Sequence, residues 1–231
     1  LLIVFLNMLS ASVFNKIISK THNKVIGVAK NYVPQTSDIV YNRIKNPYFF
    51  FKPNSSIIDA TESNPKPIKI DSEGDVIPEI ELGFMISKTG KHIKEDEWQS
   101  YVGGYFLAMD ITDAKVLQKE PMNLAFCKGQ DSFTPIGKLL LPEDVEDPHD
   151  LTLKLEVNGS PRIEGKTGEM IYSVSKMIRM LSMYMTLEQG DMILTGSPIS
   201  AGRVKPGDQV KAQMFAEDDL LDEFSLNVEV L

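Results

Sequence analysis

Two glutamates on one predicted strand are the residues of this chain whose type and spacing could do chemistry. Residues 76–86 are apolar apart from Glu79 and Glu81. Residues two apart in an extended strand point to the same face, so these carboxylates project side by side. Neighbouring like charges are costly unless a cation neutralises them. Oxygen-only ligands favour Mg²⁺, Mn²⁺ or Ca²⁺ over structural zinc. An edge strand that shows its polar face to water is the alternative interpretation.

The next predicted strand carries a third candidate ligand. Residues 101–112 are mostly apolar, and their only acid, Asp110, lies near the C-terminal end of the run. Three carboxylate oxygens from two strands, completed by water and substrate, are typical of a magnesium site. Asp110 could instead be the N-cap of a helix over 112–119. We favour the metal site.

Composition narrows the class of protein. The 231 residues suffice for one full-sized core, and 42% apolar with 24% charged residues is ordinary for a globular protein. The formal net charge of −8 argues against nucleic acid as a partner. Cys127 is the only cysteine, which excludes an intrachain disulfide. The three histidines lie far apart in polar surroundings, and we expect them at the surface.

The N-terminal stretch is unlike the rest of the chain. The first acid is Asp38, and the apolar run at 1–6 is far shorter than the ~20 residues that span a bilayer. We assign residues 1–23 to an N-terminal extension, either a targeting or a disordered segment, and 24–231 to a catalytic domain. Cytoplasm and mitochondrion both remain open as the compartment.

Strands dominate the elements that must position these groups. The pattern predicts one long helix over 173–187 and a hairpin around the Asn158–Gly159 turn. No glycine-rich dinucleotide motif, phosphate-binding loop or nucleophile elbow is present, which disfavours nucleotide-dependent and serine-hydrolase chemistry. We predict a single α+β domain with few helices.

Several segments, in this order, resemble the fumarylacetoacetate hydrolase family, close to its small single-domain acylpyruvases and oxaloacetate decarboxylases. The resembling segments are Glu79-Ile-Glu-Leu-Gly, Tyr101-Val-Gly-Gly-Tyr ending in Asp110, Lys128-Gly-Gln-Asp-Ser-Phe-Thr-Pro-Ile-Gly137, Val157-Asn-Gly leading to Arg162, Gly165-Lys-Thr-Gly-Glu-Met-Ile-Tyr-Ser173 and Gly190-Asp-Met-Ile-Leu-Thr-Gly-Ser-Pro198. The resemblance implies the mixed β-sandwich or β-roll of the family's C-terminal domain. It also implies a homodimer, which we expect to form through the strands around 101–110.

The resemblance assigns roles to individual residues. The family's metal ligands fall on Glu79, Glu81 and Asp110, the residues reached above from side-chain placement. Its active-site lysine falls on Lys128, which would bind the substrate carboxylate or a developing enolate. Without the resemblance, a solvated lysine would be the simpler interpretation. Further substrate contacts fall on Thr195, Tyr32 and Lys30.

Two departures from the family pattern affect the expected reaction. Gln35 occupies the place of the general-base histidine, and Asp38 the place of its partner glutamate. Glutamine cannot take a proton from water near neutral pH. The substrate-facing arginine is replaced by Ala114, and Lys115 is the neighbouring candidate to compensate.

These observations predict a metal-dependent enzyme that acts on a small 2-oxo or 1,3-dioxo acid through an enolate. Hydrolysis of a C–C bond needs an activated water, whereas decarboxylation or tautomerisation of oxaloacetate does not. Gln35 therefore favours decarboxylase or tautomerase chemistry. The alternatives are an authentic acylpyruvate hydrolase with another base, and a catalytically silent metal-binding relative.

Overall fold

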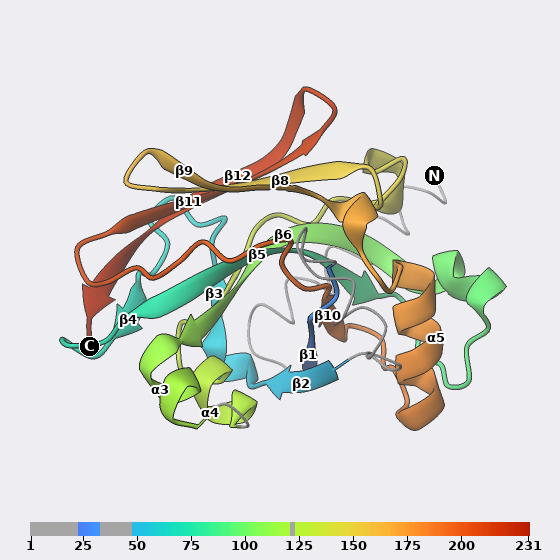
Figure 1. Cartoon of the computed structure of the whole chain (residues 1–231). Helices are drawn as coiled ribbons and strands as arrows, with labels where there is room; N and C mark the ends of the chain where they lie inside the picture. Colours follow the sequence, from blue (N-terminus) through green and yellow to red (C-terminus); the bar gives the residue numbers. More distant parts are fainter. Residues whose placement is uncertain (1–22, 33–47, 121–122) are drawn as a thin grey trace.

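The computed structural model describes residues 23–32, 48–120 and 123–231 (Figure 1). Its strands are β1 Val25–Ala29, β2 Tyr48–Lys52, β3 Ile57–Asp59, β4 Ile68–Ile70, β5 Val76–Ile86, β6 Val102–Asp113, β7 Thr134–Ile136, β8 Leu151–Val157, β9 Ser160–Lys166, β10 Met192–Leu194, β11 Gln209–Ala216 and β12 Asp219–Val230. Its helices are α3 Ala114–Lys119, α4 Leu124–Lys128 and α5 Val174–Tyr184, with short 3₁₀ turns at Asn54–Ser56, Glu95–Tyr101, Pro142–Asp144 and Thr167–Glu169.

The described strands form two sheets. One has seven strands in the order β2-β1-β10-β5-β6-β7-β3, and the other has five in the order β4-β12-β11-β8-β9. The five-stranded sheet lies against one face of β5 and β6, and the larger apolar core fills the space between the two sheets (Figure 1). Alternate residues of β5 and β6, such as Leu82 and Leu107, point into this core. The other residues of both strands therefore face away from the five-stranded sheet.

The seven-stranded sheet is strongly curled. Its two edge strands, β2 and β3, follow one another in the chain and are joined only by residues 53–56. So short a connection cannot cross a flat seven-stranded sheet, whose edges would lie about 29 Å apart at ~4.8 Å per strand. A second, smaller apolar cluster lies on the enclosed face, and it includes Phe106, Ala108 and Leu194. This enclosed face also carries the polar groups of the candidate site.

A buried aspartate ties the first described strand to the sheet. Asp191 precedes β10 and is fully buried. Its carboxylate accepts hydrogen bonds from the backbone N–H groups of Glu188, at 2.6 Å, and Lys24, at 3.2 Å. The Lys24 ammonium lies 2.5 Å from Asp191 Oδ2, the oxygen that also accepts from Glu188. These contacts hold β1 parallel to β10, a pairing between residues far apart in the sequence.

The predicted α+β fold with mixed sheets and few helices is confirmed. The sequence pattern missed β3, β7 and α4, which have three, three and five residues. The boundary between an extension at 1–23 and a domain at 24–231 stays a prediction, because residues 1–22 lie outside the described part of the chain. Among the described residues, no helix combines the length and apolar character needed to cross a bilayer.

Two smaller expectations need correction. β6 is buried along almost its whole length within one chain, so it offers no surface for the dimer contact expected around 101–110. Dimerisation itself stays a prediction. His92 is exposed as expected, but His149 is half-buried, and its Nε2 accepts the backbone N–H of Val174 at the start of α5, at 3.2 Å.

We expect stability to depend on pH through Asp222. This carboxylate on β12 accepts the backbone N–H of Lys138 at 3.0 Å, and burial raises its pKa to about 6. The ordinary aspartate pKa is ~3.9, so the folded state holds a proton that the unfolded state has released between about pH 4 and 6. Stability is therefore lost as pH rises through this window.

The Asp222→Asn variant keeps an oxygen acceptor but cannot ionise. Its free energy of unfolding relative to wild type should improve by about 1 kcal/mol between pH 4 and 7, a value discounted for partial solvent access. Denaturant melts across this range measure the difference. The exposed Asp219 on the same strand provides the control variant, Asp219→Asn. A constant difference between Asp222→Asn and wild type from pH 4 to 8 would contradict the expectation.

Candidate metal and substrate site

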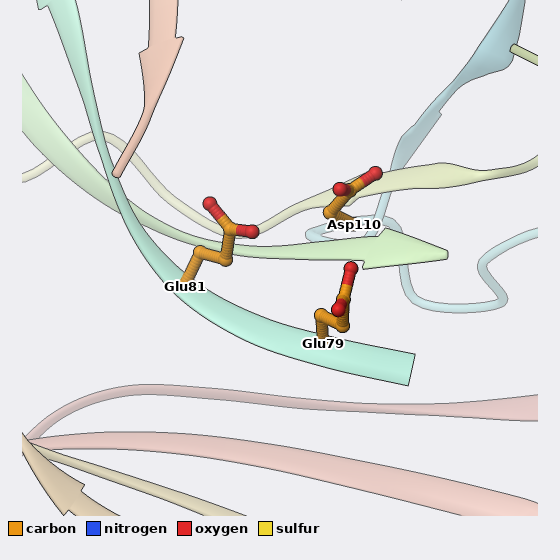
Figure 2. Close-up of side chains that lie close together, drawn as sticks. All are labelled: Glu79, Glu81 and Asp110. Carbon is orange, nitrogen blue, oxygen red and sulfur yellow. The ribbon is translucent and has the colours of Figure 1, made fainter. Parts of the chain in front are cut away.

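The three predicted carboxylates come together on the enclosed face of the curled sheet. Glu79 on β5 pairs directly with Asp110 on the antiparallel β6, and Glu81 lies two residues further along β5. Figure 2 shows the three side chains on one side of this strand pair. One oxygen from each residue lies within 4.8 Å of the others, a spacing that a single cation could bridge. Asp110 belongs to β6 and is 1% exposed, whereas Asp113 is the N-cap of α3.

Two lysines reach the same cluster. The Lys128 ammonium, at the end of α4, donates to Glu79 Oε2, Asp110 Oδ2 and Thr112 Oγ1, the last at 2.7 Å. The Lys52 ammonium, at the end of β2, donates to Asp110 Oδ1. Each oxygen of Asp110 therefore bonds to a different lysine. Three carboxylates against two lysines leave the cluster with one excess negative charge.

Among the described residues, Glu81 is the carboxylate of the three that forms no ion pair with a lysine. Burial acts to raise the pKa of Asp110, but Lys128 and Lys52 outweigh it and hold this pKa below its usual range. Burial raises the pKa of Glu81 well above its usual range, and the charges of Asp110 and Glu79 add to the shift. The hydrogen bond that Glu81 Oε2 accepts is a backbone one, from Gly196 at 2.6 Å. A further cation beside Glu81 would remove this cost.

The turn after β10 supplies that backbone donor. Gly196 has a φ of +94°, in the region that favours glycine, and a Cβ there would lie 2.9 Å from the carbonyl oxygen of Val28. Asn31 fixes the turn, because its side-chain amide donates to the carbonyl of Thr195 at 2.8 Å and to that of Tyr172 at 3.0 Å. The same turn therefore positions Thr195 beside the carboxylate cluster.

Two buried hydroxyl groups lie at this turn without a well-formed hydrogen bond. Among the described side chains, Tyr32 Oη and Thr195 Oγ1 are buried and meet no partner of good geometry. Burial raises the pKa of Tyr32, and the Glu81 charge adds to the shift, so its hydroxyl stays protonated and close to Glu81. Buried hydroxyl groups normally have partners, so these two are suited to an oxygen-rich ligand.

The residues present fit a divalent cation of the magnesium type. All candidate ligands are carboxylate oxygens, two of them buried, and nearby hydroxyl groups can contact what the ion carries. Among the described residues, no histidine or cysteine takes part in a cluster that could hold a metal. The chemistry of this donor set therefore favours Mg²⁺, Mn²⁺ or Ca²⁺ over zinc or copper.

The structure does not bring the other predicted site residues into the carboxylate cluster, or does not describe them. Lys30 is exposed, and its ammonium lies 5.3 Å from the centre of the Tyr48 ring, outside the carboxylate network. Gln35 and Asp38 lie outside the described residues. Ala114 is buried at the start of α3, and Lys115 is exposed on the same helix. Lys52, rather than Lys115, is the second cation that reaches the cluster.

Sequence reasoning missed Lys52, Thr112 and Asn31. Lys52 closes the aromatic run 48–51, where a lysine at the end of a strand normally reaches solvent. Its position two residues after Phe50 was the available signal, since both then share one face of β2. Asn31 and Thr112 carried no signal in the sequence alone, because each acts through a partner that only the fold brings close.

Comparisons with known proteins agree with this geometry. A family model described as fumarylacetoacetate (FAA) hydrolase C-terminal matches residues 24–223. "Oxaloacetate tautomerase FAHD1, mitochondrial" of Oryza sativa subsp. japonica is 35% identical over 198 residues, 82% of this chain and 84% of the relative. "Oxaloacetate decarboxylase, mitochondrial" of Dictyostelium discoideum is 34% identical over 202 residues, 86% of this chain and 92% of the relative. The crystal structure of yeast ynq8, a fumarylacetoacetate hydrolase family protein, aligns with a TM-score of 0.79 at 28% identity, over 94% of this chain and 96% of that one.

Proposed function

This chain belongs to the fumarylacetoacetate hydrolase family, and from that premise we propose that it is a divalent-cation-dependent enzyme acting on oxaloacetate through an enolate. The observation that carries the proposal is the cluster of Glu79, Glu81 and Asp110, two of them buried, in which three carboxylates face two lysines. The proposal is further supported by relatives that are named as oxaloacetate tautomerases and an oxaloacetate decarboxylase.

Each group at the site has a chemical task in this proposal. Glu79, Glu81 and Asp110 would hold the ion, which would supply a Lewis acid for the 2-oxo group and an electron sink for the enolate. The Lys128 ammonium would bind the substrate carboxylate or stabilise the enolate oxygen. The hydroxyl groups of Tyr32 and Thr195 would donate hydrogen bonds to the substrate, which would give both of them the partners they lack.

Oxaloacetate chemistry suits this set of groups better than C–C hydrolysis. Tautomerisation moves one proton between C3 and the 2-oxo oxygen, and decarboxylation breaks the C3–C4 bond and releases CO₂. Tautomerisation passes through the enolate of oxaloacetate, whereas decarboxylation leaves the enolate of pyruvate, which then takes up a proton at C3. Neither reaction consumes a water molecule. Hydrolysis of an acylpyruvate needs a base that activates water, and Gln35 stands where the family resemblance places that base.

The names of the relatives also support a proposal about the compartment. Two of the relatives are named as mitochondrial. The stretch before Asp38 contains lysines and serines but no acid, a composition compatible with a transit segment. We therefore favour the mitochondrion over the cytoplasm for this chain.

A steady-state assay tests the proposed function. With Mg²⁺, the protein should speed the decay of enol-oxaloacetate absorbance or the formation of pyruvate, and chelation of the ion should abolish the effect. Since free Mg²⁺ also acts on oxaloacetate, the Lys128→Met variant at equal Mg²⁺ gives the matched background. Faster hydrolysis of acetylpyruvate than turnover of oxaloacetate would instead identify an authentic hydrolase. Mg²⁺ binding without turnover of either substrate would identify a catalytically silent relative.

A further inference from the structure

Lys52 is a buried cation dedicated to one carboxylate. Its side chain has no solvent-exposed area, and its ammonium donates to Asp110 Oδ1. Lys128, in contrast, divides its ammonium among three oxygens, those of Glu79, Asp110 and Thr112. The resemblance to the family and the sequence pattern both left Lys52 without a role.

Lys52 lies on a strand that is distant from Asp110 in the sheet order. β2 lies four strands away from β6 in the sheet order, a separation of about 19 Å in a flat sheet. Only the curl of the sheet brings Lys52 to Asp110. On the same face of β2, the ring of Phe50 lies 5.1 Å from the Lys128 ammonium. The edge strand β2 therefore contacts both Asp110, through Lys52, and Lys128, through Phe50.

Stability of the fold does not explain a lysine at this position. A buried ion pair is seldom more stabilising than well-packed apolar side chains of the same size. Methionine has the length of lysine without the ammonium, and the neighbours of Lys52 on β2 are aromatic. An apolar residue here would serve the core equally well. The charge is therefore better explained by what it does to Asp110.

We propose that Lys52 is a positioning residue that engages Asp110 through Oδ1 and so fixes the orientation of this carboxylate for the proposed metal site. This inference rests on the proposed function, because it assumes that Asp110 is a ligand. Partners that orient a ligand carboxylate typically contribute 10–100-fold to metal affinity. The loss of Lys52 also removes a positive charge, which by itself would strengthen cation binding. The two effects have opposite signs, so an affinity measurement separates them.

The test is calorimetric titration of the full chain with Mn²⁺. Lys52→Met should bind Mn²⁺ about 10–100-fold more weakly than wild type. Lys52→Gln, which keeps a hydrogen-bond donor, should lose less than Lys52→Met. Lys24→Met is the matched control, because it also removes a lysine from a buried aspartate, Asp191, but away from the site. It should leave Mn²⁺ affinity unchanged.

The outcomes distinguish this proposal from the proposed function. If wild type does not bind Mn²⁺, the metal-dependent function itself fails. If wild type binds and Lys52→Met binds equally or more tightly, the positioning role is overturned and the charge of Lys52 acts alone. If neither Lys52 variant folds, as judged by thermal melts beside Lys24→Met, Lys52 is a folding residue and the proposal is also overturned. Weaker binding by a folded Lys52→Met supports it.

Discussion

Replacing Glu81 with glutamine should abolish the stabilisation of this protein by Mg²⁺. Glutamine keeps an oxygen for the Gly196 N–H but removes the charge that the two lysines leave unbalanced. At a Mg²⁺ concentration of 100 times the dissociation constant, wild type should gain about 2.7 kcal/mol from the ion, and the variant should gain none. Turnover of oxaloacetate should fall by about 10³-fold, the scale on which lost electrostatic stabilisation of a transition state acts.

Thermal melts with and without Mg²⁺ measure how much the ion stabilises wild type and the Glu81→Gln variant. In metal-free buffer the Glu81→Gln variant should be at least as stable as wild type, because burial penalises the charged form of Glu81. Loss of the Mg²⁺ response without loss of metal-free stability separates a ligand from a structural residue. The exposed Glu164 on β9 gives the control Glu164→Gln, which should respond to Mg²⁺ like wild type. A full Mg²⁺ response in Glu81→Gln would remove this residue from the ligand set.

Replacing Gln35 with histidine, together with Asp38→Glu, should create acylpyruvate hydrolysis. A general base typically contributes 10²–10⁴-fold to a rate, so acetylpyruvate cleavage should rise by about that factor. Mn²⁺ affinity should not change, because the proposed ligands Glu79, Glu81 and Asp110 are untouched. The ratio of acetylpyruvate cleavage to oxaloacetate turnover is the quantity to measure.

Gln35→Asn is the matched control for this experiment, since it keeps an amide and adds no base. It should leave acetylpyruvate hydrolysis at the wild-type level. Rapid hydrolysis by the unmodified protein would refute the argument and require a base elsewhere in the chain. The nearest histidine in the sequence is His22, thirteen residues before Gln35, so a small shift in the family match supplies no histidine.

The parts of the site that could be predicted from sequence are those that local geometry fixes. Alternation along a strand placed Glu79 and Glu81 on one face, and the antiparallel neighbour brought Asp110 opposite Glu79. Thr195 and Lys128 were found only through resemblance, because nothing in their own segments indicates a substrate. Neither strand alternation nor the family resemblance identified Lys52, because its contact with Asp110 depends on the curl of the whole sheet.

In the fold, too, elements with a local sequence signal could be predicted, and elements that depend on tertiary contacts could not. The sequence predicted every described strand except β3 and β7, which have only three residues each. β4 and β10 are equally short, but turn residues beside them indicated where they lie. Three residues are too few to show a period of two. β3 and β7 exist because they complete the curled sheet, so their formation is decided by tertiary contacts rather than by local preference.

The placement of the three carboxylates on one strand pair also bears on how such a protein can diverge. All three are encoded within 32 consecutive residues, 79–110, whose pairing is local. The groups that would contact substrate come instead from separate stretches, after β1, in α4 and after β10. Substitutions in those stretches can change the substrate or the reaction while the strand pair is inherited intact. The reaction can therefore change in this architecture without disturbing the three carboxylates that are proposed to hold the ion.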